Sequence, residues 1–180
     1  MTETLAFGTV ETVLGRLLVA ATETGVVSLH FRDTPAARAR TAEAAGLPVV
    51  EAPERLAPAL SELRDYCAGD LKEFGVAIDW RLTSDVQRRV LTTLYESVPY
   101  GQVVTYGELG DRSGTGLHAQ VVGQLMGSNP VPLIVPCHRV VASNGLGGYS
   151  GGSGVEVKRW LLMLEGALPA TLDWDIGRAP

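Results

Sequence analysis

The feature that most constrains this fold is a change of residue pattern near Thr83-Ser84. Before it, short apolar runs separated by turn residues are typical of strands, and after it apolar residues recur at helical spacing. A chain of 180 residues can form one large domain or two small ones. The change therefore predicts domains over 1–82 and 83–168, followed by a loosely attached tail over 169–180.

The first half predicts a small sheet with helices. Apolar runs on either side of residues 23–25 predict a β-hairpin, because Gly25 suits the turn. Apolar side chains that alternate strictly over 74–80 predict a half-buried strand. Two further stretches favour helix, 34–52 in part and 58–68 with Gly69 as its C-cap.

The second half opens with a predicted helix. Ser84-Asp85 can cap its start, and residues 99–101, Pro-Tyr-Gly, end it. Its apolar residues recur every four positions, which predicts one buried stripe. The stripe consists of Val86, Val90, Leu94 and Val98.

Two short helices separated by a glycine turn follow. Thr105 and Glu108 fit a capping box, so a helix is expected to run from there to Arg112. Thr115 is expected to cap the second helix, which residues 127–130 stop because Pro130 cannot continue it. Its expected buried stripe consists of Leu117, Val121 and Leu125. The pattern is that of a helix-turn-helix, although two helices that merely pack together have the same spacing.

The second of these helices has a face almost without side chains. Ala119, Gly123 and Gly127 recur every four residues, although each Gly weakens a helix by about 1 kcal/mol relative to Ala. A smooth face indicates that something large approaches closely, either another helix or a DNA groove. No Lys or Arg occurs between Arg112 and Arg139, so phosphate contacts would come from backbone amides, hydroxyls and helix termini.

The charge of the chain argues against binding nucleic acid by bulk electrostatics, since the net charge is −5. Residues 85–180 carry 7 Lys and Arg against 8 Asp and Glu, which is a net charge of only −1. We therefore expect any DNA to bind this half of the chain, with an affinity that depends weakly on salt concentration. Neither a transmembrane run nor a signal peptide is recognisable, which favours a cytoplasmic protein without a membrane partner.

The surroundings of Cys137 are unusual. Neither Cys67 nor Cys137 has a spacing that suggests zinc, and reduced thiols are the simpler interpretation. A buried cysteine commonly serves packing alone. Here Pro136 precedes it and His138 follows it, and packing requires neither. A neighbouring imidazole can activate a thiol, but adjacent residues on a strand point to opposite faces, so the chain must bend or a water must relay the proton.

A glycine-rich stretch over 145–154 surrounds Tyr149-Ser150. A flexible linker has this composition, and so does a pocket lined by backbone, where Gly permits close approach. An amphipathic helix is expected over 155–164, ending at Glu165-Gly166.

With these residues together, the chain resembles the O6-alkylguanine-DNA alkyltransferases, closely over about 85–166 and weakly before that. The resemblance rests on four stretches of the second half: Asn129-Pro130-Val131-Pro132, Pro136-Cys137-His138-Arg139-Val140, Tyr149-Ser150-Gly151-Gly152 and the helix from Lys158 to Gly166.

The resemblance implies an α+β fold, with a small ribonuclease-H-like first domain and a helical second domain that carries a winged helix-turn-helix. It implies a methylated-DNA–protein-cysteine methyltransferase, which moves the alkyl group of O6-alkylguanine, or of O4-alkylthymine, irreversibly to Cys137. The helix-turn-helix would bind the minor groove of double-stranded DNA, and the nucleotide would flip out, because a stacked base cannot reach a buried thiol. Neither cofactor nor metal is implied. A monomer is expected, with cooperative binding on DNA left open.

The resemblance also implies roles for individual residues. Cys137 would accept the alkyl group, His138 would take its proton through a water, Glu165 would orient His138, and Asn129 would join the helix-turn-helix to the cysteine segment. Tyr106 would contact the flipped nucleotide, Tyr149 and Ser150 would line the guanine pocket, Met126 would pack on the base, and the carbonyls of Cys137 and Val140 would accept from its amino group. The remaining expected DNA-binding residues are Ala119, Gln120, Gly123, Gly127 and Arg139.

Two departures from the family pattern bear on activity. The family has an arginine that fills the gap left by the flipped base, and this chain has Gln120 there. The loop from Cys137 to Tyr149 is one residue shorter, which could change the alkyl groups accepted. Two other functions therefore stay open: a lesion sensor with weak transfer because of Gln120, and a Cys/His hydrolase or thiol redox sensor that needs no DNA.

Overall fold

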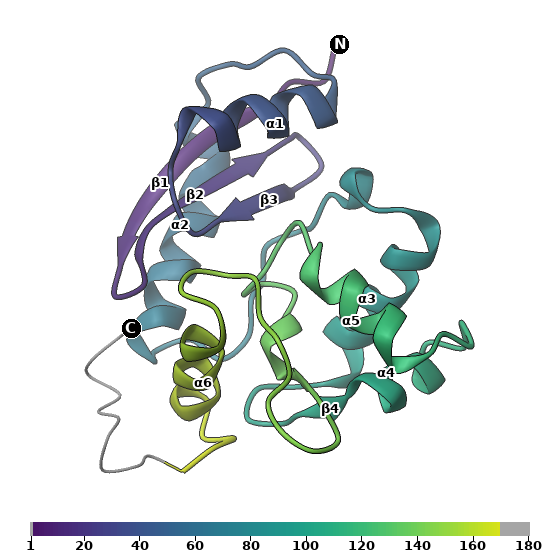
Figure 1. The fold of residues 1–180 in the computed structure, drawn as a ribbon. Helices are drawn as coiled ribbons and strands as arrows, with labels where there is room; N and C mark the ends of the chain where they lie inside the picture. The colour runs from purple at the N-terminus through teal and green to yellow at the C-terminus, as the bar shows by residue number, and fades with distance from the viewer. Residues whose placement is uncertain (1, 170–180) are drawn as a thin grey trace. The chain divides into compact units, whose positions relative to one another are not determined.

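The computed structural model describes residues 2–169, and contacts within it divide the chain into two compact units, 1–82 and 83–180. The division lies where the residue pattern changes. Of the expected tail, all but Pro169 lies outside the described residues. Figure 1 shows both units as a ribbon.

The first unit is built on an antiparallel sheet in the order β1-β2-β3. Its strands are β1 (Ala6–Thr12), β2 (Gly15–Ala21) and β3 (Val26–His30). The hairpin expected around residues 23–25 is confirmed, since β2 pairs antiparallel with β3. Gly25 is required there because a Cβ would lie 2.4 Å from the carbonyl oxygen of Ala77. The first strand, β1, was not predicted as a separate element.

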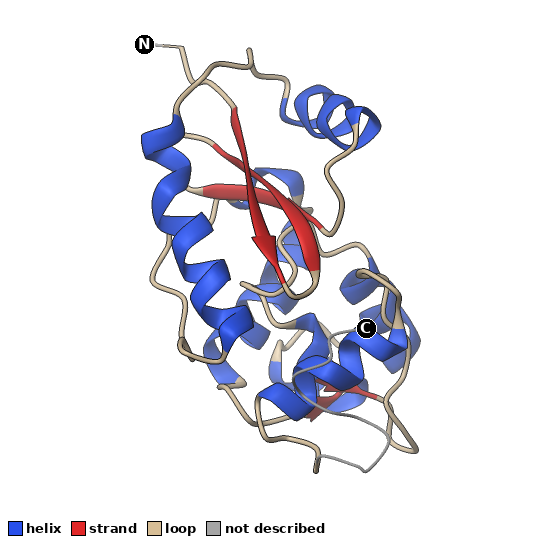
Figure 2. Ribbon diagram, turned by 90° about the vertical axis from the view of Figure 1, so that its left-hand side faces the viewer, coloured by secondary structure: helices blue, strands red, loops and turns tan. Residues whose placement is uncertain are grey.

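Two helices complete this unit. Helix α2 (Pro53–Ala68) runs along the sheet (Figure 2), and Gly8 of β1 leaves room for Leu56 and Leu60 of this helix. Helix α1 (Pro35–Ala45) begins after Thr34, whose side chain accepts from the Ala37 amide. It contributes Ala42 and Ala45 to a cluster around the buried residues Leu5, Ala20 and Val27.

Two expectations for the first unit are wrong. The helix expected over 58–68 begins five residues earlier, at Pro53, and accommodates Pro58 within it, although Gly69 ends it as expected. Residues 74–80 do not form a strand. Only Ile78 bridges to Val26, while Trp80–Leu82 is a 3₁₀ turn (η1). Residues 74–78 alternate between half-buried and exposed, but Asp79 is buried, so the alternation does not extend to residue 80.

The second unit begins with α3 (Asp85–Ser97), and the Ser84 side chain caps it by accepting from the Gln87 amide. The expected stripe is partly wrong, because Val86 is 48% exposed. Leu91 is buried instead, together with Val90 and Leu94, so the buried face follows the mixed three- and four-residue spacing of a helix.

The helix-turn-helix consists of α4 (Tyr106–Arg112) and α5 (Ala119–Gly127). The capping box of Thr105 and Glu108 is present as predicted. The expected start of α5 at Thr115 is wrong, because Gly116 has a φ of +68° and the helix begins after His118. Its expected stripe is wrong too. The buried residues of α5 are Val122 and Met126.

Three short elements complete the second unit. Strands β4 (Val104–Thr105) and β5 (Val140–Val141) pair in parallel, and the 3₁₀ turn η2 (Cys137–Arg139) precedes β5. Helix α6 (Val155–Leu164) ends at Glu165, as the sequence predicts. No helix in the described part of the chain is long and apolar enough to cross a membrane.

Candidate active site

The segment around Cys137 is not a regular strand. This departure is needed if the His138 imidazole is to lie near the Cys137 thiol, because adjacent side chains of a strand point to opposite faces. Residues 131–135 form a buried turn in which the Val135 amide donates to the Val131 carbonyl and Leu133 has a φ of +70°. Pro136 then leads into η2, so Cys137 and His138 lie on a tight turn rather than on opposite faces of a strand.

Asn129 ties this segment to the end of α5. Its side-chain amide donates to the Val135 carbonyl at 2.9 Å, and its side-chain oxygen accepts from the Val131 amide at 3.0 Å. The same side chain hydrogen-bonds to Cys137 and lowers the pKa of the thiol. The helix-turn-helix and the cysteine are thereby joined through one residue.

Burial raises the pKa of the Cys137 thiol above its ordinary value of 9.0. The hydrogen bond from Asn129, the charge of Lys158 and the backbone amides of η2 oppose this effect without reversing it. The thiol is therefore protonated at neutral pH, and a nucleophilic reaction needs a base nearby.

Three buried polar side chains interact beside η2. They are the imidazole of His138, the guanidinium of Arg139 and the carboxylate of Glu165. His138 Nε2 lies 2.8 Å from Glu165 Oε1, and Arg139 donates to both carboxylate oxygens of Glu165 at 2.9 Å. Although burial opposes ionisation, these two partners lower the pKa of Glu165 to about 2. Burial also lowers the pKa of His138 below 6.5, so its imidazole is neutral at pH 7.

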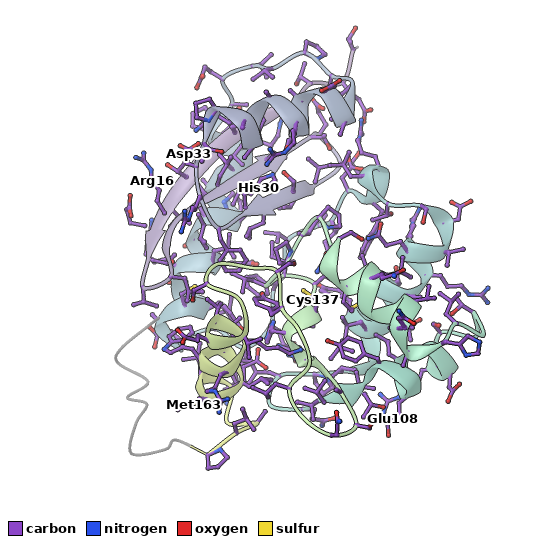
Figure 3. All side chains as sticks on the ribbon, in the orientation of Figure 1. Arg16, His30, Asp33, Glu108, Cys137 and Met163 are labelled. Carbon is purple, nitrogen blue, oxygen red and sulfur yellow. The ribbon has the colours of Figure 1, made fainter. Side chains whose placement is uncertain are left out.

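A cavity of about 600 Å³ opens beside Cys137. It gathers nine of the residues that the sequence assigned to the site: Tyr106, Ala119, Gln120, Gly123, Met126, Gly127, Cys137, Tyr149 and Ser150. The smooth face of α5 is therefore one wall of this cavity. In Figure 3, Cys137 lies inside the second unit, whereas Glu108 lies at its edge.

Arg139 and Val140 are placed differently from expectation. Arg139, expected to bind DNA, is only 7% exposed, because Glu165 and the Val98 carbonyl hold its guanidinium inside the unit. The Val140 carbonyl, expected to accept from a guanine amino group, accepts from Lys158 Nζ at 2.6 Å.

Lys158 is one of the residues of this site that sequence reasoning missed. It is fully buried, and its Nζ also donates to the Gly148 carbonyl at 3.0 Å and to the Tyr106 hydroxyl at 3.3 Å. Burial lowers its pKa to about 8. A signal was available, since a lysine on the apolar face of an amphipathic helix is unusual.

The glycine-rich loop packs on Tyr106. Gly147 has a φ of +72°, and a Cβ there would lie 2.7 Å from the Tyr106 hydroxyl oxygen. Ser150 Oγ donates to the Gly127 carbonyl at 3.0 Å, which joins the loop to the end of α5. Gln124 and Gly148 also line the cavity, although neither is among the residues expected there.

Within residues 2–169, no group of three or more His, Cys, Asp or Glu side chains is placed to hold a metal ion.

Two family profiles match the chain. The profile described as "6-O-methylguanine DNA methyltransferase, ribonuclease-like domain" matches residues 5–80, and the corresponding DNA binding domain matches residues 85–167. A protein of Mycolicibacterium paratuberculosis named "Methylated-DNA--protein-cysteine methyltransferase" is 36% identical over 162 residues, which is 89% of this chain and 92% of that protein.

Solved structures agree with the profiles. The structure of Mycobacterium tuberculosis OGT in complex with DNA matches with a TM-score of 0.74 and 33% identity over 90% of this chain and 93% of that one. An O6-methylguanine-DNA methyltransferase from Pyrococcus kodakaraensis matches with a TM-score of 0.62 and 25% identity over 91% and 99% of the two chains. The α+β fold is therefore a ribonuclease-like domain followed by a helical DNA-binding domain, and this chain belongs to the O6-methylguanine DNA methyltransferase family.

Proposed function

We propose that this protein repairs double-stranded DNA by moving the alkyl group of O6-alkylguanine, or of O4-alkylthymine, to Sγ of Cys137, once per molecule. The observation that carries the proposal is the position of Cys137. Its thiol lines a cavity of about 600 Å³, one wall of which is the smooth face of a helix-turn-helix. Family membership supplies the reaction class, and the cavity supplies a place for the base.

The transfer is a displacement at carbon. The Cys137 thiolate forms a bond to the alkyl carbon while the bond between that carbon and O6 breaks. The electron pair of the broken bond stays with guanine, which takes up one proton from the surrounding water in place of the alkyl group, and this proton balances the one that the thiol has lost. The product is a thioether with no easy route back to the thiol, so no cofactor is needed and no second turnover occurs.

His138 would provide the base. The pKa of the buried thiol is raised and the pKa of His138 is lowered, so the resting pair at pH 7 is a neutral thiol and a neutral imidazole. A water between them would carry the proton to the imidazole. Glu165 would then stabilise the imidazolium through the 2.8 Å contact, which supports a role as the orienting carboxylate.

The nucleotide would have to leave the stack, because O6 of a paired guanine cannot reach a thiol that is 5% exposed. Helix α5 would lie in the minor groove, with Ala119, Gly123 and Gly127 allowing close approach. Within the cavity, Tyr106, Tyr149 and Ser150 would contact the flipped nucleotide and Met126 would pack on the base. The Val140 carbonyl already accepts a hydrogen bond from Lys158 Nζ. To bind the guanine amino group, this carbonyl would have to accept a second hydrogen bond or lose the one from Lys158.

The reaction consumes a reduced thiol, which favours a reducing compartment such as the cytoplasm. All the residues named for the chemistry lie in one chain, which is consistent with a monomer. Cooperative binding along DNA remains compatible with this assignment.

A second candidate function is a lesion sensor that flips alkylguanine but transfers slowly. Gln120 favours it, because this exposed amide lines the cavity where the family has arginine. The presence of Cys137 with its His138–Glu165 pair favours transfer instead.

Intact mass spectrometry tests the proposal. Incubation with duplex DNA containing O6-methylguanine should add one methyl mass to the peptide that holds Cys137. Cys137→Ser should abolish the addition. Cys67→Ser is the matched control and should retain it, because burial raises the pKa of Cys67 to about 11 and its thiol does not line the cavity. Unmodified wild-type protein that still binds the lesion tightly would favour the sensor.

A further inference from the structure

The exposed positive charge of the second unit gathers near the helix-turn-helix. Over residues 83–169, Arg139 and Lys158 are buried and four cations are exposed. Three of these four lie on α3 and α4, the helices that pack with α5, and the fourth lies on α6. The exposed cations are Arg88, Arg89, Arg112 and Arg159.

Arg89, on α3, reaches the turn between α4 and α5. Its Nη2 lies 3.8 Å from the position that a Cβ on Gly114 would take, and Gly114 has a φ of +64° within that turn. Arg112, by comparison, directs Nη1 toward the Ser97 carbonyl at 3.5 Å. Among the described residues, no carboxylate lies within ion-pair distance of the Arg89 guanidinium.

A cation held at this turn suits a DNA phosphate. Helix α5 itself has neither Lys nor Arg, so a duplex seated on its smooth face meets no positive side chain there. Arginine binds phosphate through charge-assisted hydrogen bonds, and such contacts fix the register of a protein on the duplex without reading sequence.

We propose that Arg89 neutralises one backbone phosphate of the bound duplex at the turn between α4 and α5. The proposal rests on the DNA binding assigned above and adds a side-chain cation to the amides and hydroxyls expected from the sequence. It places one electrostatic contact on α3, outside the helix that approaches the bases.

The test measures how affinity depends on salt. Full-length protein carrying Cys137→Ser, which cannot be alkylated, is titrated with fluorescent duplex containing O6-methylguanine at several salt concentrations. Each phosphate contact contributes about 0.9 to the slope of log affinity against log salt. Arg89→Gln should lower the slope by about that amount and weaken binding several-fold, whereas Arg89→Lys should retain most of the slope.

Arg159→Gln is the matched control, because it removes the same charge from an exposed position on α6. In Figure 1, α6 and the turn between α4 and α5 lie on opposite sides of the second unit. The control should leave the slope unchanged. An equal loss in both variants, or no loss in Arg89→Gln, would overturn the proposal. Failure of the proposed function would appear separately, as wild-type protein that gains no methyl mass.

Discussion

His138 Nε2 lies 2.8 Å from Glu165 Oε1, and neither side chain is exposed to solvent. Arg139 donates to both oxygens of the same carboxylate. One buried carboxylate therefore serves two neighbouring residues of η2. It stabilises a protonated His138, and it holds the guanidinium of Arg139 inside the unit.

We expect Glu165→Gln to destabilise the protein and slow transfer. Removing one partner of a buried pair costs about 3–5 kcal/mol, because the other charge, here Arg139, stays buried without compensation. Transfer should slow because His138 loses the carboxylate that raises its pKa and becomes a weaker base. Urea unfolding and single-turnover transfer measure the two effects. Glu156→Gln, at an exposed position of α6, should change neither by a comparable amount.

The rate of transfer should fall in acid with a midpoint below pH 6.5. Burial lowers the pKa of His138 below 6.5, and Glu165 only partly opposes this effect. The imidazole therefore stays neutral, and able to accept a proton, until the pH falls to this lowered pKa. The check is the pH profile of reaction with the free base O6-benzylguanine, which avoids effects on DNA binding. An inflection above pH 6.5 would contradict the assignment of His138.

The free energy of unfolding should also fall below pH 6.5, because folding lowers the pKa of His138. The unfolded chain binds a proton to His138 near its ordinary pKa of 6.5, whereas the folded chain binds it only at lower pH. The stabilising contribution is thus complete above pH 6.5 and is lost as the pH falls through the folded value. Circular dichroism at each pH separates this loss from a loss of activity.

Gly147→Ala should slow transfer to both duplex DNA and O6-benzylguanine. A Cβ at this position would lie 2.7 Å from the Tyr106 hydroxyl, and the φ of +72° is strained for any residue with a side chain. Either the loop or Tyr106 must therefore move. Gly145→Ala is the control, because no atom lies within 4 Å of its added Cβ and its φ is not positive. Equal rates in the two variants would show that the packing of Tyr106 is unimportant.

The sequence predicts a helix cap correctly where residues close together in the chain determine it. The capping box of Thr105 and Glu108 and the cap by Ser84 depend on contacts three residues apart, so both appear as predicted. The start of α5 was misplaced because Thr115 has cap chemistry, while the φ of +68° at Gly116 depends on the path of the whole turn.

Features that depend on tertiary packing could not be predicted from the sequence. The alternation predicted over 74–80 gives alternate burial only over 74–78, and the number of backbone pairs depends on how the segment meets β3 at Val26. The family resemblance implies that Arg139 binds DNA, and only the fold brings Glu165, at the end of α6, to its guanidinium. The cavity joins residues from four separated segments, and the family resemblance, rather than spacing, indicates that those residues belong together.

Gln120→Arg should accelerate repair of duplex DNA more than it accelerates reaction with O6-benzylguanine. Flipping a nucleotide costs a few kcal/mol, and a longer charged side chain at the cavity can fill the space that the base leaves. Free O6-benzylguanine needs no flipping, so its rate should change little. Gln124→Arg controls for charge, since Gln124 lines the same cavity one turn further along α5. If both variants accelerate duplex repair equally, attraction of DNA rather than support of flipping explains the gain, and Gln120 loses its assigned role.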